Sequence, residues 1–508
     1  MLLFGNKQFI CTNIDNYILD LSFIFNKVQL IFHIFSWIPK TLFIGLVDIY
    51  IYSGLFRFSK SYKISIVNLQ IAYPDINNNN MQLLVRMSVR ESLISVYETI
   101  YTWGNSEFVS NKLNITDNDI KKLRSYRLSS LRTQMELNNI DACILSDAVN
   151  IRYATDARNM QIFTSRNSPS RYLILTNNKS ILFEFKGCEH LSDHLSTIDE
   201  IRTSSTASFV ASGHNIEIKE KEWVKDISNT LINLIGAKKT IGLERMNAAI
   251  GIGLQENGFK VVDAQLPIEL ARSIKSDEEI ICIKNSLIAT ENAICELKES
   301  LMPGISENQL WSIFYKSIIE QDGDYCETRL LSSGEKTNPW FQETGKKIIN
   351  QNELVAFDTD VVGCYGYYSD FSRTFHSGPD DPTKTQKELY NIAKDQVDHN
   401  INIIKEGMSF KEYSEKAWNI PDKYRANRYY LSAHGCGMTG EYPYLYHKND
   451  YQESGYDGII KNNMTLCVES YIGEKDGKEG VKLEQQILVK KNEIEILSKF
   501  PFEKKFLN

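Results

Sequence analysis

One stretch, FDTDVVGCYGYYSDFSRTF at residues 357–375, places Asp358, Asp360 and Asp370 within thirteen positions of one another. The surrounding residues are aromatic or apolar, and the glycines of GCYG are typical of a turn between two strands. Because side chains alternate across a strand, we expect Asp358 and Asp360 on one face, with Asp370 opposite them on the returning strand. Three like charges packed in a sheet repel one another unless cations neutralise them. The stretch predicts either a metal site or an acidic sheet edge that faces solvent.

Three residues further along the chain extend this set. His434 lies in the glycine-rich segment LSAHGCGMTGEYP, Glu469 in the predicted strand TLCVES, and Glu484 in the predicted strand VKLEQQILV. With the three aspartates they provide five carboxylates and one imidazole, which is enough to hold two divalent ions about 3.5–4 Å apart. Oxygen ligands with a single nitrogen suit iron, manganese, cobalt or zinc. An ordered set on predicted strands favours the metal site over a chance collection of surface acids.

The length and composition of the chain set wider limits. A chain of 508 residues is too long for one compact domain, and two or three are expected. The formal net charge of -7 gives no general footprint for nucleic acid. The nine cysteines are scattered, odd in number and without a CxxC pair. This pattern indicates reduced thiols and a cytoplasmic protein, not a disulfide framework.

Residues 1–110 form an apolar segment that we expect to be helical. Charged residues interrupt the apolar run at 18–58, so it is too broken for a membrane-spanning helix. Cations follow it up to Lys63, and residues 18–63 therefore favour a peripheral contact with the inner face of a membrane. A helix pair packed on the rest of the protein is the alternative. Residues 59–103, with NLQIAYPDI, resemble the start of bacterial lipid A acyltransferases, which act through an HxxxxD motif. His33 is the only histidine before residue 190 and has no aspartate five positions after it, so we expect docking without acyltransferase activity.

Residues 115–270 alternate helices and short strands, as in an α/β domain. SYRLSSLRTQMELNNIDACILSDAVNIRYAT predicts an amphipathic helix, a strand and a loop, and YLILTNNKSILFEF predicts a hairpin. TIGLERM and GFKVVDA predict further strands, while GIGLQENG is too loose a glycine pattern for a nucleotide site. A new domain opens at 271, where Ser276 and Glu279 form a capping box before a helix.

The order Asp-x-Asp, Asp, His, Glu, Glu resembles that of the creatinase/methionine-aminopeptidase "pita-bread" family, over roughly residues 118–508. Within that family the chain is most similar to the dimethylsulfoniopropionate lyases of the DddP type. The stretches that carry this likeness are NIRYATDARNMQ, ETRLLSSGEKTNPWFQE, FDTDVVGCYG, DFSRTF, CVESYIGE, GVKLEQQILV and FPFEKKFL.

The resemblance implies an α/β (α+β) fold with a creatinase-like domain at 115–270 and a pita-bread catalytic domain at 271–508, behind the extra apolar segment. It also implies that the six residues bind two metal ions, usually iron, in a homodimer. The implied reaction is β-elimination to dimethyl sulfide and acrylate.

Histidine placement favours a lyase over a peptidase. Dinuclear peptidases of this fold use additional histidines before the first aspartate and around the ligand histidine. Here no histidine lies between His214 and His376, and none lies between His434 and His447.

Aromatic residues stand instead at the expected substrate positions. Trp340 and Phe341 could pack against a sulfonium, since a cation is attracted to aromatic faces, although core packing explains them equally well. Tyr429 stands where these lyases have a substrate-site tyrosine, and Phe163 replaces their tryptophan.

One position departs from the lyase pattern. Gly440 replaces the aspartate that the resemblance identifies as the base. The proton would then be taken by Glu441, by Tyr429 or by a hydroxide held by the metals, unless the substrate differs. Gly440 also permits a positive φ that aspartate would adopt only at a cost. Three functions stay open: a lyase for dimethylsulfoniopropionate or a similar small cationic carboxylate, an Xaa-Pro peptidase or creatinase-like hydrolase, and a non-catalytic relative.

Overall fold

The computed structural model describes residues 112–507 and short pieces at 46–51, 53, 81–82, 84–86 and 89. The chain divides into two compact units, Met1–Val109 and Ser110–Asn508. In the first unit, Val47 and Ile51 share a small apolar cluster with Val85 and Val89. Most of the segment expected to contact a membrane lies outside the described residues. Within the described parts of the chain, no helix has the length and apolar character needed to cross a membrane.

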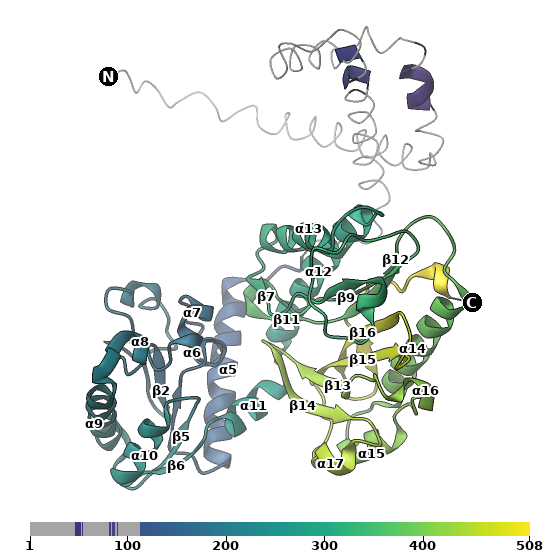
Figure 1. The fold of residues 1–508 in the computed structure, drawn as a ribbon. Coiled ribbons are helices and arrows are strands. Elements are labelled where there is room, and N and C mark those ends of the chain that lie inside the picture. Colours follow the sequence, from purple (N-terminus) through teal and green to yellow (C-terminus); the bar gives the residue numbers. More distant parts are fainter. Residues whose placement is uncertain are drawn as a thin grey trace, which may run out of the picture. The chain divides into compact units, whose positions relative to one another are not determined.

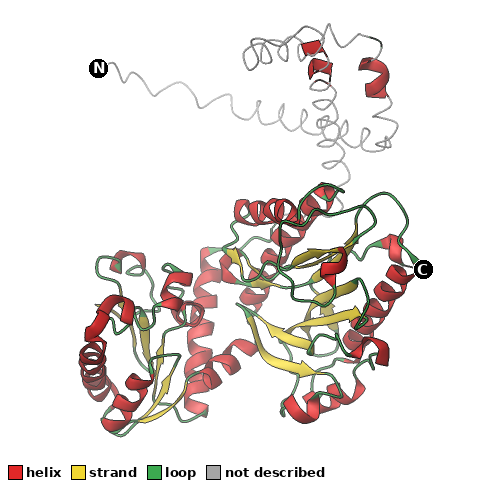
Figure 2. Cartoon of the chain, viewed as in Figure 1, coloured by secondary structure: helices red, strands yellow, loops and turns green. Residues whose placement is uncertain are grey.

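The second unit begins with a mixed six-stranded sheet flanked by helices (Figures 1 and 2). The strand order is β4-β3-β2-β1-β5-β6, in which β1–β2 and β2–β3 are antiparallel and the other pairs are parallel. The strands are β1 (Ala142–Leu145), β2 (Tyr172–Thr176), β3 (Ser180–Glu184), β4 (Glu200–Thr203), β5 (Thr240–Leu243) and β6 (Lys260–Asp263). The helices are α5 (Asp117–Leu137), α6 (Ala148–Thr155), α7 (Gln161–Arg166), α8 (Phe209–Ser212), α9 (Ile216–Ile235), α10 (Ala248–Glu256) and α11 (Gln265–Ser273).

Both faces of this sheet are buried because its strands carry apolar residues at successive positions. Ile144 of β1 packs in one cluster with Trp223 of α9. Cys143 and Leu145, which point to the opposite face, pack in another cluster with Leu131 of α5. The strands and the hairpin expected from the sequence are confirmed, and GIGLQENG lies largely in α10.

The loop expected after the first strand is wrong in part, because residues 148–155 form helix α6. The side chain of Asp147 accepts a hydrogen bond from the backbone N–H of Val149 at 2.8 Å and caps this helix. The cap residue and the apolar spacing of a short helix were both present in the sequence.

The remainder of the unit combines three small sheets with helices. The orders are β11-β10-β7, β12-β9-β8 and β14-β13-β15-β16-β17. The strands are β7 (Tyr325–Cys326), β8 (Leu331–Ser333), β9 (Leu354–Asp358), β10 (Val361–Val362), β11 (Tyr368–Ser369), β12 (Ser372–His376), β13 (Leu431–Cys436), β14 (Gly440–Tyr446), β15 (Thr465–Gly473), β16 (Gly480–Val489) and β17 (Ile494–Ile496). The helices are α12 (Asp277–Ser300), α13 (Glu307–Glu320), α14 (Lys384–Ile403), α15 (Phe410–Lys416), α16 (Asp422–Arg425) and α17 (Tyr451–Ser454).

The capping box predicted at Ser276 and Glu279 is confirmed at the start of α12. Ser276 caps α12, and the Glu279 side chain reaches back to the Ser276 backbone N–H at 2.9 Å.

The aspartate-rich stretch differs from the single hairpin that its sequence predicts. β9 pairs with β12, whereas β10 pairs with β11 in a separate sheet. The break falls at Asp360, whose φ of 43° lies in the left-handed region. Asp358 and Asp360 therefore do not alternate along one strand, and the turn at 364–366 connects β10 to β11.

Candidate metal centre and active site

Strand pairing brings the six candidate ligands together from four parts of the chain. Glu469 on β15 lies directly opposite Glu484 on β16. His434 on β13 lies opposite Cys467, two residues before Glu469. Asp358 ends β9, while Asp370 lies between β11 and β12, beside the strand that pairs with β9.

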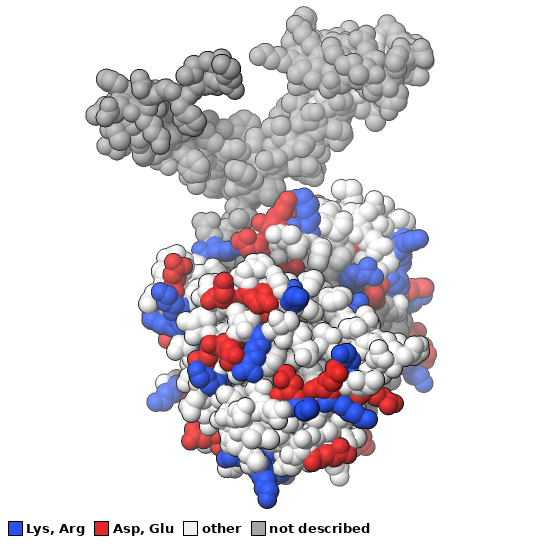
Figure 3. Space-filling view, turned by 90° about the vertical axis from the view of Figure 1, so that its left-hand side faces the viewer, with Lys and Arg blue, Asp and Glu red and all other residues white. Residues whose placement is uncertain are grey.

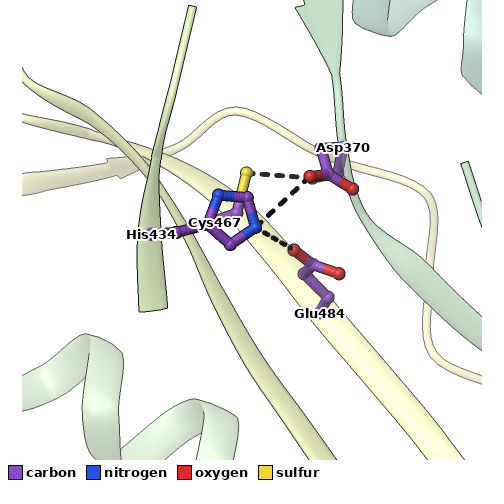
Figure 4. Close-up of side chains that lie close together, drawn as sticks. All are labelled: Asp370, His434, Cys467 and Glu484. Carbon is purple, nitrogen blue, oxygen red and sulfur yellow. Dashed lines mark hydrogen bonds and ion pairs between the residues drawn. The ribbon is translucent and has the colours of Figure 1, made fainter. Parts of the chain in front are cut away.

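The imidazole of His434 lies among three of these carboxylates, and Figure 4 shows it beside two of them, Asp370 and Glu484. Its Nε2 atom is 3.4 Å from Asp370 Oδ2, 3.6 Å from Glu484 Oε1 and 3.7 Å from Glu469 Oε1. Carboxylate atoms of Asp358, Asp360 and Asp370 also lie within 4.8 Å of one another. Asp370 belongs to both groups and joins them into one cluster.

Hydroxyl groups fix the orientation of the aspartates. Tyr368 donates to one oxygen of Asp360 at 2.9 Å, and Thr328 donates to the other. Ser372 donates to Asp358 at 2.8 Å and is 2.7 Å from Glu484. Such contacts hold carboxylates in place for a metal ion.

A buried lysine that the sequence analysis did not single out contacts the same cluster. Lys482 Nζ is 2.7 Å from Glu484, 3.0 Å from Glu469 and 3.2 Å from Asp358. Lys482 stands two positions before Glu484 on β16, so the alternation of side chains along a strand places both on one face. The same rule applied to Glu469 indicates Cys467, which lies with Asp370, His434 and Glu484.

The carboxylates of the cluster carry more negative charge than the neighbouring cation neutralises. Burial and the carboxylate of Asp358 raise the pKa of Asp360 to about 7, and burial raises the pKa of Glu469 to about 8. One carboxylate oxygen each of Asp370, Glu469 and Glu484 is buried without a hydrogen-bond partner among the described residues. One lysine against five carboxylates leaves both charge and acceptors available, and the residues therefore fit divalent cations.

Aromatic rings stand beside the carboxylates. The Lys482 ammonium lies 5.9 Å from the ring centroid of Trp340 and 5.2 Å from that of Tyr429. The ring of Phe341, a half-exposed residue, lies 5.3 Å from that of Tyr429. Burial, then the nearby carboxylates of Glu469 and Glu484, raises the pKa of Tyr429 far above its ordinary value. Trp340 and Tyr429 thus lie next to the cluster, and Phe341 lies beside Tyr429.

Two predicted residues do not join this group. Phe163, on α7, is 50% exposed and contacts the ring of Phe185 at 6.4 Å. It lines a surface pocket whose walls include none of the six candidate ligands. Glu441 is buried, with Arg272 Nη2 at 2.7 Å and Lys275 on its other oxygen. Both carboxylate oxygens are thus engaged by cations, and this arrangement speaks against Glu441 as the base.

Gly440 lies at the edge of the centre with ordinary backbone geometry. It is absent from the described glycines with positive φ, contrary to the strain that the sequence suggested. A Cβ atom at Gly440 would lie 3.9 Å from Cε1 and Nδ1 of His434, at van der Waals distance. A side chain added at this position would therefore have room beside His434.

Comparisons with known proteins agree with this architecture. Residues 127–274 match the creatinase/prolidase N-terminal domain, and residues 281–491 match metallopeptidase family M24. Dimethylsulfoniopropionate lyases DddP from Roseovarius nubinhibens and Roseobacter denitrificans are each 27% identical over 390 residues, covering 76% of this chain and 87% of each relative. An uncharacterized peptidase from Staphylococcus aureus is 25% identical over 374 residues, covering 72% of this chain and 97% of the relative.

Solved peptidases share the fold. The Xaa-Pro dipeptidase from Bacillus anthracis has a TM-score of 0.59 at 20% identity, covering 75% of this chain and 99% of its own. The prolidase from Pyrococcus horikoshii has a TM-score of 0.58 at 21% identity, covering 74% and 99%. These two family matches lie within residues 127–491, and the likeness of residues 59–103 to lipid A acyltransferases has no support. The predicted fold class is confirmed: the chain carries a creatinase/prolidase N-terminal domain followed by a catalytic domain of metallopeptidase family M24.

Proposed function

We propose that this protein is a metal-dependent lyase that cleaves dimethylsulfoniopropionate, or a similar small cationic carboxylate, into dimethyl sulfide and acrylate. The observation that carries the proposal is the row of aromatic rings at Trp340, Phe341 and Tyr429 beside the carboxylate cluster. A methylated sulfonium is attracted to such rings. Among the described residues, His434 is the only imidazole that contacts the cluster, so the site offers no second one for amide chemistry. The lyase relatives support the same substrate class.

The site residues divide the work as follows. Asp358, Asp360, Asp370, His434, Glu469 and Glu484 would hold two divalent ions, iron in the first instance, with manganese, zinc or cobalt as alternatives. Bound there, the ions would neutralise the substrate carboxylate and acidify the adjacent C–H bond. The aromatic rings would hold the sulfonium end away from water.

β-Elimination then needs a single proton acceptor. The base takes the proton next to the carboxylate, the C–H electron pair forms the carbon–carbon double bond, and the C–S pair leaves with dimethyl sulfide. Tyr429 faces the cluster and Glu441 does not, so Tyr429 is the better candidate base. Burial, and then the surrounding carboxylates, raise the pKa of its hydroxyl, so its action as a base would depend on cations bound in the cluster.

The second candidate is hydrolysis of an Xaa-Pro dipeptide. The fold that the chain shares with solved prolidases favours it. The described histidine nearest in sequence to the ligand histidine, His447, is buried, and burial lowers its pKa to about 4. It bonds the Tyr429 carbonyl at 3.0 Å, and this leaves it poorly placed for proton transfer at an amide.

Headspace gas chromatography on purified protein, supplied with iron or manganese, tests the proposal. We expect dimethyl sulfide and acrylate in equal amounts, and their loss in Tyr429→Phe. Metal-loaded protein that releases neither product would overturn it. We also propose a homodimer, which light scattering would test, and a peripheral membrane contact through residues 18–63, which vesicle sedimentation would test. A cytoplasmic location is a further proposal.

A further inference from the structure

A second cavity, of about 570 Å³, is lined by residues of both domains in the unit Ser110–Asn508. The first domain contributes Arg124 and Arg127 from α5, together with Arg152 and Arg158. The catalytic domain contributes Asp324 and the turn between β10 and β11. None of the six candidate metal ligands lines it.

Four guanidinium groups share only two carboxylates in this cavity. Asp156 accepts from Arg124 at 2.8 Å and from Arg127 at 2.9 Å. Asp324 accepts from Arg152 at 2.6 Å and from Arg158 at 2.5 Å. Among the described residues, neither arginine forms an ion pair with another acid.

The rim does not remove the excess of positive charge. Lys112 pairs with Asp322 at 3.0 Å, and Asp117 adds one more acid. The whole lining therefore has five cations and four acids, with its arginines concentrated on the two shared aspartates.

Two of these arginines are buried with donors to spare. Arg127 and Arg152 are almost inaccessible, and the Nε atom of each has no hydrogen-bond partner among the described residues. Burial lowers the pKa of Arg152, and the charge of Arg158 lowers it further, although Asp324 opposes both. A buried guanidinium with too few acceptors is costly, and an anion in the cavity would relieve that cost.

We propose that this cavity binds a small oxyanion with two or more negative charges, of the phosphate type. The guanidinium fork matches phosphate oxygens with paired hydrogen bonds, and four such groups converge here. The volume accommodates inorganic phosphate or the phosphate group of a small metabolite, which share this chemistry. The inference stands independently of the reaction at the metal centre.

Isothermal titration calorimetry of the full-length protein tests the site. Inorganic phosphate and glycerol 3-phosphate would be titrated separately in a zwitterionic buffer, with sodium chloride at matched ionic strength as reference. We expect one site per chain with at least one of the two probes, and the tighter probe tells free phosphate from a phosphate monoester. Arg158→Met should weaken binding at least tenfold; its side chain is 52% exposed, and we expect the variant to fold.

Two control variants separate this site from others. Arg202→Met removes an arginine that pairs with Glu200 outside the cavity, and it should bind as the unmutated protein does. Phosphate also binds divalent ions, but Glu484→Ala, which alters the metal centre, should retain binding. No heat beyond that of chloride would overturn the proposal. So would full binding by Arg158→Met together with loss in Glu484→Ala, because phosphate would then lie on the metals.

Discussion

Glu441 holds two buried cations in the unit Ser110–Asn508, with Arg272 on one carboxylate oxygen and Lys275 on the other. Arg272 also donates to Asn150 of α6 at 2.9 Å, and Asn150 donates to Glu244 at 2.6 Å. This network connects the first domain to β14, the strand that begins at Gly440. Glu441 therefore positions the edge of the active site.

The first prediction concerns the stability that this network provides. Glu441→Gln removes the negative charge between two buried cations and should lower the free energy of unfolding by about 3–5 kcal/mol. Urea unfolding measures this loss, and Glu269→Gln is the control, because Glu269 is partly exposed and lies 3.9 Å from Arg272. Unchanged stability with a lost proton-transfer limb in the pH–rate profile would instead identify Glu441 as the base.

The second prediction concerns Gly440. Gly440→Asp should raise dimethyl sulfide release by about 10²-fold or more, because it places a carboxylate beside His434 without backbone strain. Gly440→Asn is the matched control, since it has the same shape but accepts no proton. If aspartate and asparagine give the same rate as glycine, proton abstraction from this position is wrong.

The third prediction is a pH dependence of stability that arises at His447. Burial lowers its pKa from 6.5 to about 4, so the unfolded state binds more protons between those values. Stability from this group is present above pH 6.5 and is lost as the pH falls toward 4, by about 3 kcal/mol. Unfolding curves across this range should be flatter for His447→Asn. An equally steep loss in that variant would assign the acid sensitivity to other groups.

Residue types carried much of the candidate site but not its orientation. The six proposed ligands lie close together, as their residue types and their order along the chain predict. Glu441 and Gly440 are adjacent in sequence, yet only Gly440 faces His434, because neighbours in β14 point to opposite sides. Its position next to Gly440 in the sequence is the only feature that suggests Glu441 as the base. Its contacts with Arg272 and Lys275 come from segments far away in the chain.

At the scale of elements, the candidate metal centre depends on pairing among β9, β12, β13, β15 and β16.

The fourth prediction is that purified protein contains up to two transition-metal ions per chain, and that Glu484→Ala loses most of them. Glu484, like Glu469, contacts both His434 and Lys482, so its removal takes away one of the two acids that lie between these cations. Inductively coupled plasma mass spectrometry measures the content. Glu479→Ala, an acid one residue before β16, is the control and should retain metal. Unmutated protein without metal after reconstitution would contradict a two-metal centre.

The aspartate stretch shows which part of an element the sequence could not supply. Its turn glycines and β-rich residues predicted a single hairpin, whereas the structure has two separate pairings, of β9 with β12 and of β10 with β11. The strands change sheets at Asp360, where the backbone adopts a left-handed φ that aspartate tolerates better than most residues but that its sequence does not require. Thr328 and Tyr368 hold that aspartate from outside the strand. The break is therefore a product of tertiary contacts.

For the molecule as a whole, helix and strand periodicity in the sequence predicts an α/β chain with a second domain that is rich in carboxylates. The path of the chain between the small sheets depends on contacts such as that of Thr374 with Lys482 at 2.9 Å, which links two sheets. Long-range contacts of this kind leave no local pattern. The choice between lyase and peptidase depends on the side chains that surround the candidate metal centre.

The fifth prediction compares both reactions on one metal-loaded preparation. Dimethylsulfoniopropionate and an Xaa-Pro dipeptide are supplied separately, and kcat/KM is measured for each from acrylate and free proline. We predict that the sulfonium substrate is cleaved with the higher kcat/KM and that Glu484→Ala abolishes the activity. Hydrolysis of the dipeptide without release of dimethyl sulfide or acrylate would contradict the lyase assignment and identify a dipeptidase.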